Sequence, residues 1–331
     1  MNLAIQNQIF CIYCEEPFDP EGDDIHPNRS GFWCSCCDWF NFFDPSQDTR
    51  KFTLVLEENS CINEPPPVKK GIKLNKRLSV LRYPGAKSKV ADHLYQFVTA
   101  GKTDMLVSPY AGGASVELAF LHAGVFKKLA LNDYDFGVYS LFHLIKTFPE
   151  ALTMEIQHAK PTHDDYIQAR QIIKSDYEGC DLFQAAWSLL LVNRLAFSGI
   201  FKANPLGGIR GSRQTLLSRW NPDDLCKRIN TIHAMGDRFT VHNQDAIEFI
   251  EEYYWYDNAT LLIDPPYVKQ GKNLYLHYYD EDDHLKLQLL LDGLHQEFPC
   301  ADLIVTYDND PLIEQIYKFP EITRLKRRFS A

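Results

Sequence analysis

The stretch MLVSPYAGGASVELAFLHAG, residues 105–124, contains the pattern that decides the fold. It begins with a short apolar run typical of a buried strand, continues through a glycine turn, and ends with the apolar spacing of an amphipathic helix. KKLALNDYD at 127–135 predicts the next strand, and RFTVHNQDAIEFI at 238–250 repeats the order of strand, turn and helix. Strands that alternate with helices in this way indicate an α/β domain with a parallel sheet.

The glycine turn predicts a ligand site. Gly112 and Gly113 let the backbone approach a ligand at the start of the following helix. Asp133 comes about 20 residues later, where an acid can accept hydrogen bonds from ribose hydroxyls. The two features together favour a cofactor that carries a nucleoside. A phosphate loop is excluded, because G-x-x-x-x-G-K-S/T is missing and Pro109 and Tyr110 replace its usual polar entry.

The stretch LLIDPPYVKQ at 261–270 places an acid, two prolines and a tyrosine directly after three aliphatic residues. A strand that merely ends in a proline turn is one interpretation. Another proline run, EPPP at 64–67, lies among polar and charged residues and is typical of a linker. The second run differs because 261–263 predicts a buried strand, whose carboxyl end would hold Asp264. Open α/β sheets bind their ligands at this end of the strands.

Five of the nine cysteines lie within residues 11–37 and form two C-x2-C pairs, Cys11–Cys14 and Cys34–Cys37. This spacing predicts a tetrahedral zinc site, with Cys36 as a spare thiol and His26 as a possible substitute ligand. We therefore predict a small β zinc ribbon over residues 1–58, including the run KFTLVLEE at its end. So short a segment could not bury enough surface without the metal, which would be structural.

The formal net charge of −10 is unevenly distributed along the chain. Residues 1–60 contain 11 acidic and 3 basic residues. Phosphates would repel such a ribbon, so we expect it to have a structural role or to contact a protein partner. Residues 69–89 hold eight Lys or Arg, and residues 182–222 hold five more, with no acid in either stretch. Acid-free stretches in an acidic chain favour a polyanionic partner at one surface.

The remaining organisation is simpler. Residues 59–78 predict a linker, and 79–331 form the main domain, with a mainly helical span at about 140–236. Residues 1–10 lack the basic start and long apolar core of a signal peptide, and no transmembrane segment is expected. A cytoplasmic location without a membrane partner is the default expectation.

From about Lys76 onward, roughly three-quarters of the chain resembles the DNA adenine-N6 methyltransferases of the Dam type. RYPGAK at 82–87 is similar to the opening cofactor motif, PYAGGAS at 109–115 to the S-adenosylmethionine glycine loop, and LNDYD to the segment with the ribose acid. NRLAFSGIFK at 193–202 resembles the start of the target-recognition region. DPPY resembles the catalytic motif, and the order of the motifs is that of the same group.

The resemblance implies a Rossmann-like S-adenosylmethionine-dependent methyltransferase sheet with a helical target-recognition insertion, in a bacterial or phage-infected cell. It implies a catalytic motif formed by Asp264, Pro265, Pro266 and Tyr267. The cofactor residues that it implies are Tyr83, Gly85, Lys87, Pro109, Gly112, Gly113, Ser115, Asp133, Asp245 and Asp264. The predicted contacts to double-stranded DNA are Asn193, Arg194, Lys202, Arg210, Arg213 and Arg219, although Asn193 and Arg194 could instead cap a helix.

The implied chemistry explains why these residue types occur together. Adenine N6 is a poor nucleophile, because its lone pair is delocalised into the ring. The Asp264 carboxylate and the Pro265 carbonyl could accept hydrogen bonds from both N–H groups, and the prolines would keep these acceptors rigid. The adenine must leave the duplex to be reached, and Tyr267 could stack on it.

Several alternatives stay open. The family usually continues beyond RRFSA at 327–331 into another strand, so this chain could be an impaired module that binds DNA or a partner without turnover. The accepting group could also be cytosine N4, or an amine or amide of RNA or protein. Protection from a restriction enzyme, phage DNA modification and gene regulation fit equally well.

Overall fold

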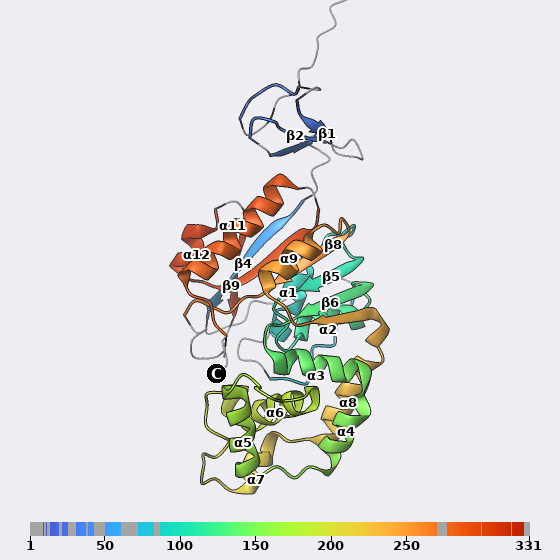
Figure 1. The fold of residues 1–331 in the computed structure, drawn as a ribbon, viewed down its shortest axis with the longest axis vertical. Helices are drawn as coiled ribbons and strands as arrows, with labels where there is room; N and C mark the ends of the chain where they lie inside the picture. The colour runs from blue at the N-terminus through green and yellow to red at the C-terminus, as the bar shows by residue number, and fades with distance from the viewer. Residues whose placement is uncertain are drawn as a thin grey trace, which may run out of the picture.

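The computed structural model describes residues 9, 11, 14–19, 22–25, 31–37, 39–42, 50–60, 72–82, 87–269, 277–298, 300–318 and 320–327. These residues contain a small antiparallel sheet near the N-terminus and a seven-stranded sheet that forms the main domain (Figure 1). The small sheet consists of β1 (Asp24–Ile25), β2 (Gly31–Trp33) and β3 (Phe40–Phe42). No helix in the described part of the chain could cross a bilayer, since none is both long and apolar enough.

The large sheet has the strand order β10-β4-β9-β8-β5-β6-β7, and every neighbouring pair is parallel. Its strands are apolar because helices cover both faces of the sheet, as parallel sheets require. Their bounds are β4 (Phe52–Asn59), β5 (Met105–Ser108), β6 (Lys128–Asn132), β7 (Phe239–His242), β8 (Ala259–Ile263), β9 (Asp302–Asp308) and β10 (Glu321–Arg327). The predicted α/β class and methyltransferase-like parallel sheet are confirmed.

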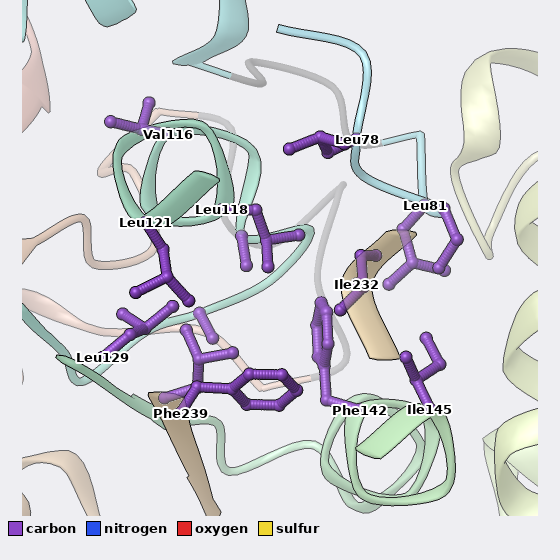
Figure 2. Packing of buried hydrophobic residues seen from close by; sticks show 14 of the residues in the cluster. Leu78, Leu81, Val116, Leu118, Leu121, Leu129, Phe142, Ile145, Ile232 and Phe239 are labelled. Carbon is purple, nitrogen blue, oxygen red and sulfur yellow. The ribbon is translucent and has the colours of Figure 1, made fainter. Parts of the chain in front are cut away.

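Side chains alternate between two hydrophobic clusters, one on each face of the sheet, because successive strand residues point to opposite sides. Leu106 belongs to the first cluster and Val107 to the second. In Figure 2, Leu118 of α2 and Phe142 of α3 converge with Phe239 of β7 in the first cluster. The helices of this face are α1 (Ala91–Tyr95), α2 (Ser115–His122) and α3 (Phe136–Thr147). The helices of the other face are α9 (Ala246–Tyr254), α11 (Glu281–Glu297) and α12 (Pro311–Ile316).

Between β6 and β7 the chain leaves the sheet and forms a mainly helical insertion, as the sequence predicts (Figure 1). Capping boxes start two of its helices, with Thr162 and Asp165 at one helix and Asp181 and Gln184 at the other. The insertion contains α4 (Pro149–His158), α5 (His163–Lys174), α6 (Leu182–Leu195), η3 (Phe197–Gly199), α7 (Arg213–Leu216), η4 (Leu217–Arg219), α8 (Pro222–His233) and η5 (Gly236–Arg238).

Strand β4 corrects one expectation from the sequence. The run KFTLVLEE was assigned to the zinc ribbon, but it lies in the main sheet between β9 and β10, parallel to both. The assignment is wrong because the first six of the eight residues of β4 are buried, as in a strand covered on both faces. Among the described strands, β10 pairs with β4 alone, so the edge of the main sheet depends on a strand that precedes the expected linker.

The small sheet contacts the main domain at the end of α11. The Trp33 indole N–H donates to the Glu297 carbonyl over 2.6 Å, and its ring lies 6.2 Å from that of Phe298. Arg50, just before β4, donates to the His295 carbonyl over 2.8 Å. Most of the expected linker at 59–78, residues 61–71, lies outside the described residues, as do residues 328–331.

Replacing Leu54 with alanine should lower the free energy of unfolding by about 2–5 kcal/mol, because the change leaves a cavity in a packed core. Leu54 is fully buried in β4, whereas Ile322, its neighbour in β10, is 37% exposed. Ile322→Ala is therefore a matched control, expected to cost less than about 1 kcal/mol. Urea denaturation of the full chain measures both. Equal losses for the two variants would contradict the placement of β4 in the main sheet.

Candidate active site and metal site

A cavity of about 780 Å³ lies at the carboxyl ends of the central strands. The segments that follow β5, β6, β7 and β8 all contribute to its lining, together with Lys87 of η2 (Lys87–Lys89) and residues of the helical insertion. This is the edge at which open α/β sheets bind ligands, and its volume is that of a typical small-molecule site. The cavity therefore occupies the place that the strand-end motifs predict.

The glycine loop after β5 forms one wall of this cavity, through Pro109, Gly112, Gly113 and Ser115. Gly112 has φ +47°, in the left-handed region that favours glycine. Its N–H donates to Asp133 Oδ2 over 2.7 Å, which joins the loop to the end of β6. Helix α2 begins directly after the loop, at Ser115.

Acidic side chains line the wall beside the loop. Burial raises the pKa of Asp133 to about 7, and the negative charge of Asp135 adds to this effect. Asp133 Oδ1 accepts from the Asp135 N–H, while Asp135 caps α3. Asp245 caps α9 by accepting from the Ile247 N–H over 2.8 Å, and it also lines the cavity. The structure thus brings the predicted acids at the ends of β6 and β7, Asp133 and Asp245, into one site.

The DPPY segment also contributes to the lining of this cavity. Asp264 Oδ1 accepts from Lys87 Nζ over 2.8 Å and from Thr306 Oγ1 over 2.7 Å. Among the described residues, Asp264 Oδ2 has no hydrogen-bond partner. The side chain is 28% exposed and lines the same cavity as Gly112. One carboxylate oxygen is therefore fixed and the other is available to a ligand.

The other residues of the motif differ in their environments. Pro266 and Tyr267 line the cavity, whereas Pro265 is buried beneath it. Tyr267 is only 7% exposed, and its hydroxyl donates to Glu57 Oε2 over 3.1 Å and also contacts the Lys87 ammonium. Lys87 Nζ lies 4.5 Å from the centre of the Tyr267 ring. Glu57 and Lys87 therefore hold the Tyr267 side chain in place.

Glu57 is a site residue that the sequence interpretation missed. It stands near the end of β4 and carries ion pairs to Lys87 and Arg327. The only signal for it in the sequence was a carboxylate directly after the apolar run LVL at 54–56. That signal is weak, because an acid after a strand is usually solvated.

Two predicted DNA contacts have structural roles here. The Asn193 side chain accepts from the Arg82 N–H over 2.7 Å and donates to the Arg82 carbonyl over 2.9 Å. Arg194 donates to the Val80 carbonyl, and both side chains are buried. They hold residues 80–82 in place, and both also line the cavity. Tyr83 and Gly85 themselves lie outside the described residues.

The other predicted DNA contacts lie in the segment between α6 and α8. Lys202, Arg210 and Arg213 are exposed, Arg219 is half-buried, and none of the four lines the cavity. The cavity is also lined by basic residues that the site prediction omitted, among them Lys76, Arg77, Arg82 and Arg228. The first three of these belong to the acid-free stretch at 69–89. Burial and the like charges of Arg219 and Arg228 lower the pKa of Arg82.

The four predicted zinc ligands lie together. The sulfur atoms of Cys11, Cys14, Cys34 and Cys37 are all within 4.8 Å of one another. Four thiolates converging on one point fit a structural zinc ion with tetrahedral coordination. Cys36 is exposed and stands outside the group, and His26 lies outside the described residues. The Asn41 amide donates to Cys11 Sγ over 3.3 Å, as expected for a ligand sulfur with an outer hydrogen-bond donor.

Comparison with known proteins agrees with this geometry. The sequence model of the D12 class N6 adenine-specific DNA methyltransferases matches residues 83–331. The chain belongs to this family. It is also 19% identical over 230 residues to the Type II methyltransferase M.MjaIII of Methanocaldococcus jannaschii. This match covers 62% of this chain and 76% of that protein. The resemblance predicted from the motifs is confirmed.

The zinc content of the D12 class chain tests the cysteine cluster. Purified protein should contain about one zinc ion per chain, as four thiolates suit one tetrahedral site. Cys14→Ser should lose most of the metal, whereas Cys36→Ser should keep it because Cys36 is exposed and outside the group. Elemental analysis measures both variants. Full zinc retention by Cys14→Ser would show that this cluster is not the metal site.

Glu117 in α2 should make the stability of this methyltransferase depend on pH. Burial, followed by the charge of Asp264, raises the pKa of Glu117 to about 7 from the ordinary 4.5. The stability contribution of such a group is fully present below pH 4.5, and it is lost as the pH rises through 7. Between pH 5 and 8 the wild type should therefore lose about 2–3 kcal/mol relative to Glu117→Gln.

Urea denaturation at several pH values measures this difference. Glu248→Gln is the control, because Glu248 is exposed on α9 and its replacement should leave the pH dependence unchanged. Parallel pH curves for the wild type and Glu117→Gln would rule out a buried, protonated Glu117.

Proposed function

We propose that the chain transfers a methyl group from S-adenosylmethionine to N6 of adenine in double-stranded DNA, with the adenine extruded from the duplex. One observation carries the proposal. Asp264, at the end of β8, shares a cavity with the glycine loop and keeps one carboxylate oxygen without a partner among the described residues. Membership of the D12 class family supports the choice of DNA adenine as the substrate.

The cofactor would lie along the wall formed by the glycine loop. When bound, S-adenosylmethionine supplies a methyl group on a positively charged sulfur. The loop backbone at Gly112 and Gly113 permits close approach, and Asp133 would accept hydrogen bonds from the ribose hydroxyls. Asp245 stands at the next strand end, where it would lie near the adenine ring of the cofactor. These residues fit a nucleoside.

The catalytic segment would act on the target amine through its acceptors. Lys87 and Thr306 fix Asp264 Oδ1, so Oδ2 can accept a hydrogen bond from the N6 amine without reorganising. The Pro265 carbonyl would accept from the second N–H. A hydrogen bond to a charged group contributes about 1.5–3 kcal/mol, and it accelerates transfer to the extent that it strengthens in the transition state.

Extrusion of the base costs a few kcal/mol, and stacking on aromatic side chains can offset about 1–3 kcal/mol of this per base. Tyr267 would supply one such ring from the floor of the cavity. Tyr134 and Tyr278 also line the cavity and are 58% and 46% exposed. Aromatic surface is therefore present where an extruded base would enter.

The duplex would lie across the basic face next to the cavity. Arg82 is exposed there, and the repulsion from Arg219 and Arg228 that lowers its pKa would be relieved by a phosphate. Lys202, Arg210 and Arg213 extend this charge along the helical insertion, where they would contact phosphates or base edges. We propose a structural role for the zinc ribbon, with its acidic surface as a contact for a protein partner.

Two variants test the proposal directly. Asp264→Ala and Asp264→Asn should lower the rate of methyl transfer at least about 100-fold, because each removes the charged acceptor. The assay uses labelled S-adenosylmethionine and unmethylated duplex DNA, with mass spectrometry of the nucleosides. Asp282→Asn, an exposed change on α11, should leave the rate unchanged.

The product identifies the accepting amine. Wild-type protein should yield N6-methyladenine, and N4-methylcytosine would refute the adenine assignment. A wild-type chain that binds duplex DNA but transfers no methyl group would instead favour a binding module without turnover.

A further inference from the structure

Glu57 connects strand β4 to the catalytic segment. Its carboxylate is fully buried, and Lys87 and Arg327, which face it, are only 6% and 4% exposed. Glu57 Oε1 lies 3.4 Å from Lys87 Nζ, and Oε2 lies 2.7 Å from the Arg327 guanidinium. The Tyr267 hydroxyl donates to Oε2 over 3.1 Å. Three segments that are distant in sequence thus meet at one side chain.

The contacts continue from Glu57 to the reacting end of the site. Lys87 also donates to Asp264 Oδ1 over 2.8 Å, so one ammonium bridges the buried carboxylate and the catalytic one. Tyr267 belongs to the same DPPY segment as Asp264. Glu57 therefore touches Lys87, which holds Asp264 together with Thr306, and Tyr267, which follows Asp264 in the chain. Glu57 does not line the cavity itself.

The sheet alone gives no reason for a carboxylate here. Leu54, Val55 and Leu56 fill the preceding positions of β4, and each is buried. An apolar residue at position 57 would continue this packing without the cost of removing a charge from water. The partners of Glu57 that lie outside the sheet, Lys87 and Tyr267, belong to the predicted cofactor and catalytic motifs. This indicates that the Glu57 carboxylate positions residues of the site.

We propose that Glu57 is a positioning residue for methyl transfer, which holds Lys87 and Tyr267 so that Asp264 presents its second oxygen to the amine. The inference rests on the proposed function. It goes beyond that function by assigning a role to a strand that precedes residues 83–331, the segment matched by the family.

The charges around this group predict how its loss changes the pH profile. Removing a negative charge from this buried cluster makes loss of a proton easier for the site around it, so the pH profile of kcat should move to lower pH. The charged or titratable groups that face Glu57 are Lys87 from η2, Tyr267 and Asp264 after β8, and Arg327 from β10, while Glu117 from α2 faces Asp264.

Glu57→Gln is the first test, made in the full chain. We expect kcat to fall about 10- to 100-fold, the size of effect that misplaced reacting groups produce, with KM for DNA changed less than about threefold. Glu58→Gln is the matched control. Glu58 is the next residue, is 26% exposed and lies 3.8 Å from Arg324. The kcat of Glu58→Gln should therefore stay within about twofold of the wild type.

A double variant separates positioning from folding. Glu57→Gln leaves Arg327 buried without its anion and could unfold the protein, whereas Glu57→Gln with Arg327→Gln removes both charges together. The double variant should fold, as measured by circular dichroism and Tm, and should keep the low kcat. Its pH profile should shift less than that of Glu57→Gln, because loss of the Arg327 charge opposes loss of the Glu57 charge. Glu57→Asp, which keeps the charge, should recover part of the rate.

The outcomes distinguish this inference from the function on which it rests. A wild-type chain without methyl transfer would refute the proposed function. An active wild type with a folded double variant whose kcat and pH profile are those of the wild type would refute the role of Glu57. A fall in the kcat of folded Glu57→Gln without any shift of its pH profile would also overturn it, since loss of packing alone would explain that result.

Discussion

The pairing of β4 with β9 on one side and with β10 on the other is the constraint on which the rest of the main domain depends. It joins β10 to the sheet and places Arg327 beside Glu57. Because Glu57 also contacts Lys87 and Tyr267, the same pairing supports the floor of the cavity. The edge of a parallel sheet is thereby coupled to the DPPY segment, which follows another strand.

The parts of the fold that could be predicted were those encoded by short-range patterns. An apolar run, a glycine turn and an amphipathic helix specify a local geometry, and parallel strands bring their carboxyl ends to one edge. Gly112, Asp133, Asp245 and Asp264 were therefore placed together without knowledge of the strand order. The paired cysteines were predictable for the same reason, since each C-x2-C turn fixes two ligands locally.

The parts that could not be predicted depend on contacts distant in sequence. Nothing in KFTLVLEE states which strands will flank it, so its nearness to the cysteines suggested the wrong sheet. Glu57 was missed with it, because its partners lie in three other segments. Asn193 and Arg194 show the converse. The resemblance implied DNA contacts for them, with helix capping as the alternative, whereas in the structure they satisfy backbone groups of residues 80–82.

The position of β4 has a consequence for how the chain is made. Lys51, at the start of this segment, bonds to Asp302, which lies 251 residues further along the chain. During synthesis the apolar strand leaves the ribosome long before either of its neighbours exists. Contacts of such sequence separation form slowly, and an unpaired strand is prone to aggregate. We therefore expect newly made protein to need a chaperone, or low temperature, until β9 and β10 have been translated.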